Sequence, residues 1–194
     1  MWWRGGDSEL LEGLAELADR IVLDEAQPEN GWRRAVDLFD RSAFSDLRWA
    51  RLTQWRALMA HFFDIPEVRA SARSFTRLHI RTADRMAAQL FASWLTSSLE
   101  FAKGFEADIA GEGAADAENA LEEVTLGDGT QGLEIRLAGG RTCLETSVSA
   151  QGHRSASRVV SLMDSGRTGL LTDELRIRAR DVALERALRG LVGK

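Results

Sequence analysis

The sequence predicts an α+β fold in which an antiparallel β-meander is packed by helices and follows the remnant strand–helix–strand of an α/β domain. Residues 120–163 contain four short runs that alternate apolar and polar side chains, separated by glycine-containing turns. A strongly amphipathic helix is predicted over 83–99, ahead of these runs. Residues 1–43 begin with a strand, a helix and a second strand. Strands and helices that are segregated in this way are typical of mixed α+β architectures.

The first segment is predicted to be incomplete as a folding unit. Trp2 and Trp3 form the end of an apolar strand, and the helix that follows has Asp7 or Ser8 available as its N-cap. The apolar, β-branched run "RIVLDE" then reads as an interior strand. One strand–helix–strand unit cannot cover its own sheet. We therefore expect residues 1–43 to be the C-terminal remnant of an N-terminal α/β domain, with a second domain over 44–194.

The segment from Asp46 to Asp64 is predicted to be an amphipathic helix, in one piece or in two because Thr53 is a plausible internal N-cap, and Pro66 is expected to end it. We expect the stretch before it, 30–47, to be helical. At about 3.6 residues per turn, one face of the 46–64 helix collects the large apolar side chains Trp49, Leu52, Trp55, Leu58 or Met59, and Phe62.

Arginines border this apolar face, with their guanidinium groups expected in water: Arg48, Arg51 and Arg56. Two interpretations fit the pattern. The stripe is either the buried face of a core helix or a docking surface for another protein, because tryptophan and arginine dominate interface hot spots.

The middle of the chain alternates between ordered and loop-like segments. "FTRLHIRT", 75–82, alternates as a half-buried strand does, and Thr82 is predicted to cap the helix over 83–99. Residues 100–120 are rich in Gly, Ala and acidic side chains, which favours a flexible acidic loop. Beyond the meander, 168–193 is predicted to form one long helix or two helices separated near Asp181, a suitable N-cap.

Composition excludes several classes of function. The formal charge of −5 argues against a general nucleic-acid binder, which needs a concentrated basic face. The sequence has neither a signal-peptide pattern nor a run of about 20 apolar residues, so we expect a cytoplasmic protein without membrane contact. Cys143 is the single cysteine, so no disulfide can form within the chain, and a small buried hydrophobe is its default role.

Catalytic and metal-binding motifs are absent from the sequence. We find no dinucleotide fingerprint, Walker loop, nucleophile elbow or paired-cysteine site. His61, His79 and His153 lack the spacing of metal ligands, and the glycines at 127–132 lie between strands rather than before a helix. We therefore expect no catalytic residues, no metal and no cofactor.

Several stretches resemble one protein family in their order and near spacing. They are "WWRG" at Trp2–Gly5, "ADRIVLD" at Ala18–Asp24, "DLRWARLTQWRALMAHFFD" at Asp46–Asp64, "FASWLTSSL" at Phe91–Leu99 and "RDVALERALRG" at Arg180–Gly190. The chain resembles the OpcA family, the glucose-6-phosphate dehydrogenase assembly or activator proteins of cyanobacteria and other bacteria. Members of that family normally carry a larger N-terminal domain ahead of "WWRG", so the resemblance implies an N-terminally shortened chain.

The resemblance implies a non-catalytic protein that binds glucose-6-phosphate dehydrogenase and promotes its assembly or activation in the oxidative pentose phosphate pathway. Trp49, Arg51, Trp55 and Arg56 are the expected partner-binding residues. An alternative from another class stays open, in which a small-molecule-binding or enzymatic α/β domain has its site between the meander and the 83–99 helix.

Overall fold

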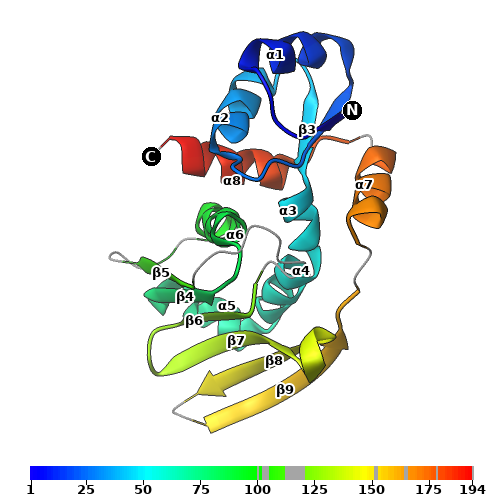
Figure 1. Cartoon of the computed structure of the whole chain (residues 1–194). Coiled ribbons are helices and arrows are strands. Elements are labelled where there is room, and N and C mark those ends of the chain that lie inside the picture. The colour runs from blue at the N-terminus through cyan, green and yellow to red at the C-terminus, as the bar shows by residue number, and fades with distance from the viewer. Residues whose placement is uncertain are drawn as a thin grey trace.

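Two β-sheets with helices between and around them make up the protein (Figure 1). The computed structural model describes residues 1–99, 101, 105–111, 121–150, 153–163, 166–177 and 179–193, with the backbone alone given for 150 and 153–156. In Figure 1, α6 lies between α8 above it and the larger sheet below it. This arrangement of strands and helices confirms the predicted α+β class.

The N-terminal sheet is parallel and has the strand order β1-β2-β3, made of β1 (Trp2–Trp3), β2 (Arg20–Leu23) and β3 (Ala43–Asp46). Helices α1 (Ser8–Leu17) and α2 (Glu29–Leu38) connect these strands. Asp7 caps α1 by accepting a hydrogen bond from the Glu9 N–H, as predicted. The sequence prediction of helix through 47 was wrong beyond Leu38, since β3 is a strand.

The second sheet contains the predicted meander. Its strand order is β5-β4-β6-β7-β8-β9, and β4 and β6 to β9 are antiparallel neighbours along that order. Its strands are β4 (Arg77–Arg81), β5 (Glu106–Ala110), β6 (Glu123–Gly127), β7 (Gln131–Ala138), β8 (Cys143–Ala150) and β9 (His153–Ser161). A 3₁₀ turn, η2 (Gly139–Arg141), joins β7 to β8, where Gly139 and Gly140 have positive φ angles of 60° and 66°.

One segment expected as loop is partly a strand. Within the acidic stretch 100–120, residues 106–110 form β5, which pairs in parallel with β4 at the edge of the sheet. Its side chains are exposed or half-buried, and for that reason the apolar alternation that reveals an inner strand is missing. Residues 100, 102–104 and 112–120 lie outside the described residues.

The predicted 46–64 helix is two helices, α3 (Leu47–Arg51) and α4 (Thr53–Phe62), joined at Leu52. Thr53 is the first residue of α4 rather than its cap; its hydroxyl accepts a hydrogen bond from Arg56 Nη2 at 3.2 Å instead. Pro66 does not end this helix. It begins a short helix, α5 (Pro66–Ser71), in the first-turn position that suits proline, and the 3₁₀ turn η1 (Ala72–Ser74) follows.

Helix α6 (Arg85–Ser98) is the central helix predicted over 83–99. Its N-cap is Asp84, whose carboxylate accepts hydrogen bonds from the Met86 and Ala87 N–H groups at 3.0 and 3.1 Å; the predicted cap, Thr82, instead bonds the backbone of Asp84. The Ser93 hydroxyl donates to the Ala187 carbonyl of α8 at 2.6 Å. This bond fixes α6 against α8.

The C-terminal region forms two helices, α7 (Gly166–Arg176) and α8 (Val182–Val192). Asp181 caps α8 as predicted, accepting from the Ala183 and Leu184 N–H groups at 3.1 and 3.0 Å. A single cluster of buried side chains extends from Trp3 through α6 to Leu188 and includes the inner faces of both sheets. The predicted division at 43/44 therefore falls inside β3 and within a shared core.

Candidate functional site

The four expected partner-binding residues lie on α3 and α4, where the chain leaves the parallel sheet. Asp46 ends β3 and caps α3 through a 2.7 Å hydrogen bond from the Arg48 N–H to its carboxylate. Trp49 and Trp55 are only 1% and 2% exposed, while Arg51 and Arg56 are half-buried. The apolar stripe of the 46–64 segment is thus a core face.

Trp49 and Arg56 are in direct contact. The guanidinium carbon of Arg56 stands 3.5 Å from the centroid of the indole ring, a distance typical of a cation–π interaction. Burial lowers the pKa of Arg56 to about 10, while the carboxylates of Asp181 and Glu174 oppose the shift. The side chain therefore stays charged at neutral pH. Its buried Nε has no hydrogen-bond partner among the described residues.

Trp49 also joins three helices. Its indole N–H donates to Asp181 Oδ2 at 2.6 Å, and the other carboxylate oxygen of Asp181 caps α8. The edge of the Trp94 ring, on α6, meets Trp49 at a centroid distance of 6.5 Å and an interplanar angle of 75°. The tryptophan that the sequence offered as a docking anchor thus positions Arg56 and ties α3 to α6 and α8.

Arg48, predicted to keep its charge in water, is buried at 6% exposure. Its Nε donates to Asp84 at 3.0 Å, and its two terminal nitrogens donate to the carbonyl oxygens of Glu25 and Ala26 in the loop after β2. Planar guanidinium donors can serve several acceptors in this way. Arg48 thus fastens the parallel sheet to the N-terminus of α6.

Asp46 completes this buried polar group. Its second carboxylate oxygen accepts a 2.7 Å hydrogen bond from the Trp32 indole. Burial raises the pKa of Asp46, although Arg48 and the hydrogen-bond donors act in the opposite direction. Sequence reasoning missed this group because its members come from separate segments of the chain, and no local spacing marks them.

A comparison with known families decides the assignment. A family model matches residues 42–188, and its description is the C-terminal domain of a glucose-6-phosphate dehydrogenase subunit, OpcA. The chain belongs to this OpcA family. A search of the curated proteins gives no match. The family match begins one residue before β3 and ends within α8, so it includes α3, α4 and the whole second sheet.

Within the OpcA-family region, the end of β9 is hydrogen-bonded to α4 through Gln54. Gln54 Nε2 donates to the Ser161 carbonyl at 3.2 Å, and its Oε1 accepts from the Met163 N–H at 2.9 Å. Arg51 differs from its neighbours: within the described part of the chain its side chain has neither a hydrogen bond nor an ion pair. Arg51 is thus the charged group of this site that remains available to a carboxylate.

Neither metal sites nor long apolar helices are found in the described part of this OpcA-family chain. No group of three or more His, Cys, Asp or Glu side chains there is placed to hold a metal ion. His61 pairs with Asp64 at 3.0 Å and His79 with Asp108 at 2.9 Å, both near the surface. Cys143 is half-buried and unbonded to another cysteine. None of the described helices is long and apolar enough to cross a membrane.

Proposed function

We propose that this chain is a non-catalytic protein that binds glucose-6-phosphate dehydrogenase in the cytoplasm and promotes its assembly or activation. Membership of the OpcA family, over residues 42–188, carries the proposal, because the family description names a component of that enzyme. The absence of a recognisable catalytic motif in the sequence is compatible with this role.

The proposed contact surface is the α3–α4 segment with Trp49, Arg51, Trp55 and Arg56. Arg51 is the direct contact, since it is only half-buried and its guanidinium has no hydrogen bond or ion pair in the described residues. Trp49 and Trp55 act indirectly, as rigid supports of α3 and α4, because both side chains are buried. Arg56 lies on Trp49 and can meet a partner only at the edge of that contact.

Activation by such a partner is a shift of population. A protein that binds the active oligomer more tightly than the inactive form moves the equilibrium by the ratio of those two affinities and no further. The proposal therefore requires differential binding, and binding alone does not satisfy it.

The direct test combines enzyme kinetics and light scattering on the same samples of the cognate dehydrogenase, with and without this chain. We expect higher activity together with a larger complex. A charge-reversed variant, Arg51→Glu, should lose the effect, whereas Arg186→Glu, on the exposed face of α8, should retain it. Unchanged activity and unchanged mass with the wild-type chain would refute the proposal for this chain.

A further inference from the structure

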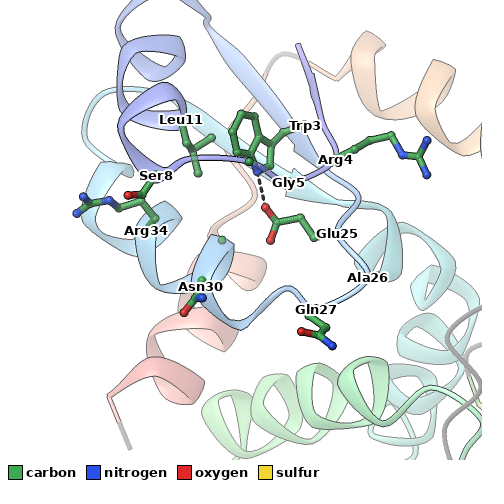
Figure 2. A pocket seen from close by; sticks show the side chains of 12 residues that line it. Trp3, Arg4, Gly5, Ser8, Leu11, Glu25, Ala26, Gln27, Asn30 and Arg34 are labelled. Carbon is green, nitrogen blue, oxygen red and sulfur yellow. Dashed lines mark hydrogen bonds between the residues drawn. The ribbon is translucent and has the colours of Figure 1, made fainter.

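A cavity of about 400 Å³ opens at the carboxyl ends of β1 and β2 (Figure 2). The β1–α1 loop, the β2–α2 loop and the N-terminal parts of α1 and α2 form its walls. A second cavity of about 360 Å³ shares Gly6, Ser8, Asn30 and Arg34 with it. These volumes lie within the range of small-molecule sites, roughly 300–1,000 Å³, and ligands of open parallel sheets bind at this end of the strands.

The cavity lies outside the α3–α4 surface and outside the 42–188 match. It belongs to the parallel-sheet half of the protein, and not to the space between the meander and α6 where the sequence placed an alternative site. The inference below does not rest on the proposed partner.

The apolar wall consists of Trp3 and Leu11. The loop between them comes close to the indole because Gly6, at φ +151°, has no side chain; an added Cβ would stand 3.0 Å from the ring. Gly5 also has a positive φ of 105°. The glycine turn thus packs against the indole, and Trp3 is only 5% exposed, so its side chain closes one wall of the cavity.

Glu25 forms the polar floor. The Trp3 indole and the Gly31 N–H both donate to its carboxylate, and Figure 2 shows the first of these bonds. Gly31 has no side chain, and any Cβ there would collide with that carboxylate. Glu25 therefore occupies the start of α2, where a bound anion would otherwise be stabilised.

This placement decides the chemistry of the ligand. A second anion is disfavoured next to Glu25 by charge repulsion. A carboxylate has about four lone-pair positions, so two remain for donors beyond the indole and the Gly31 N–H. Hydroxyl groups are the neutral donors that match such acceptors.

Donors gather at the rim of the cavity. The Arg4 side chain is 60% exposed, and its partner Asp24, at 3.6 Å, is shared with Arg167 at 3.7 Å. Arg34 pairs with Glu12 at 2.5 Å and with Asp37 at 3.8 Å through its terminal nitrogens, and its side chain is 37% exposed. Asn30 adds an amide whose Nδ2 can donate, while its Oδ1 already accepts from Arg33 at 3.3 Å. The rim can thus serve ring oxygens or an acidic substituent.

We propose that this cavity binds a small polyhydroxylated molecule of the monosaccharide class, which donates hydroxyl groups to Glu25. A phosphate ester of the same sugar fits if its phosphate faces one of the two arginines, Arg4 or Arg34, which extend to opposite sides in Figure 2, away from Glu25. The free sugar and the ester share the hydroxyl contacts, and the experiment separates them.

The test titrates the full chain with a panel of D-hexoses, their 6-phosphates and inorganic phosphate, followed by calorimetry. We expect saturable binding of at least one hexose or hexose phosphate. Glu25→Gln should weaken it at least tenfold, and Asn30→Ala by a smaller factor. Glu29→Gln, on the same helix and outside the cavity lining, should bind as wild type does.

If Glu25→Gln does not fold, hydrogen exchange on the wild-type chain can locate the ligand instead. Hydrogen exchange with the saturating sugar should slow in residues 3–11 and 25–34. Binding of inorganic phosphate alone, unaffected by Glu25→Gln, would overturn the proposal in favour of an arginine anion site. Failure of the whole panel to bind at about 10 mM, beyond the weak end of the affinity scale, would also overturn it.

Discussion

The indole N–H of Trp49 donates to a carboxylate oxygen of Asp181 at 2.6 Å, across 132 residues of sequence. The same carboxylate caps α8. Asp181→Ala removes both roles at once. A lost N-cap costs about 1 kcal/mol and a buried unpaired donor about 1–3 kcal/mol. We expect the free energy of unfolding in urea to fall by about 2–4 kcal/mol.

Asp181→Ser serves as the matched variant, since serine caps a helix but is too short to reach the indole. The free energy of unfolding of this variant should fall by less, about 1–3 kcal/mol, because only the Trp49 indole N–H is left unpaired. In a double-mutant cycle with Trp49→Phe, the coupling energy should exceed about 1 kcal/mol. Additivity within about 0.3 kcal/mol would show that the two side chains do not act together.

Arg48 also connects distant parts of the sequence, so its replacement should lower the free energy of unfolding substantially. Arg48→Met leaves Asp84 and the carbonyl oxygens of Glu25 and Ala26 without their buried donor. Breaking a buried pair in this way costs about 3–5 kcal/mol. Arg48→Lys should cost less, because one ammonium can still reach Asp84.

Arg51→Met is the control for that series. Arg51 lies three residues further along α3, only half-buried and without an ion pair in the described residues, so its replacement should change stability by less than about 0.5 kcal/mol. If Arg48→Met and Arg51→Met lowered the free energy of unfolding in urea by the same amount, the assignment of Arg48 to the core would be contradicted.

Elements with one buried face could be predicted from the sequence. The meander strands, α6 and the stripe of α3–α4 each bury one face against the core, and periodicity reports that directly. β3 was missed because all four of its residues are buried, which removes the alternation. β5 was missed for the opposite reason, since it is an edge strand with no buried residue.

The polar contacts could not be predicted. Arg48 and Arg51 look alike in the sequence, both flanking the tryptophans, yet one is buried and the other is half-exposed. The difference comes from acceptors at 25, 26 and 84, which only the fold brings together. The Trp3–Glu25 cavity was likewise invisible, because its lining comes from two loops and no motif.

Charge reversal at Arg51 should separate binding from folding. Because this guanidinium makes neither a hydrogen bond nor an ion pair in the described residues, the free energy of unfolding of Arg51→Glu should lie within about 0.5 kcal/mol of wild type. At the proposed interface it should raise the concentration needed for half-maximal activation of the dehydrogenase at least tenfold, which corresponds to about 1.4 kcal/mol. Activation that survives Arg51→Glu undiminished would move the contact surface away from α3.

Glu25 predicts a pH dependence of stability. Its burial raises the pKa of the carboxyl group, with the Trp3 indole acting against the shift. The native chain thus binds this proton more tightly than the unfolded chain does. The resulting stabilisation is complete below the ordinary glutamate pKa, about 4.3, and is lost as pH rises through the raised native value.

Denaturant unfolding of wild type and Glu25→Gln at several pH values between about 4 and 7 tests this sign. The stability of wild type relative to the variant should decrease as pH increases. Glu29→Gln, which alters an exposed carboxylate at the start of α2, the helix that follows Glu25, should run parallel to wild type. A difference that increases with pH would mean that hydrogen bonds outweigh burial at Glu25.

Two glycines predict opposite outcomes for one chemical change, and the first is Gly127 in the β6–β7 hairpin. An added Cβ there would collide with the Gln131 carbonyl oxygen and stand 3.0 Å from the Gly132 Cα. Both are backbone atoms of the paired strand, so they cannot move aside without breaking the hairpin. Gly127→Ala should therefore destabilise the chain by about 1–3 kcal/mol.

Gly13, inside α1, is the matched position without a steric conflict. No atom lies within 4 Å of the place that its Cβ would take. Gly13→Ala should stabilise the chain by about 0.5–1 kcal/mol, because alanine loses less backbone entropy than glycine when a helix forms. Urea unfolding of both variants measures whether the free energy of unfolding falls for Gly127→Ala and rises for Gly13→Ala. A Gly127→Ala chain as stable as wild type would show that the hairpin closes differently, since only a displaced β7 backbone leaves room for the methyl group.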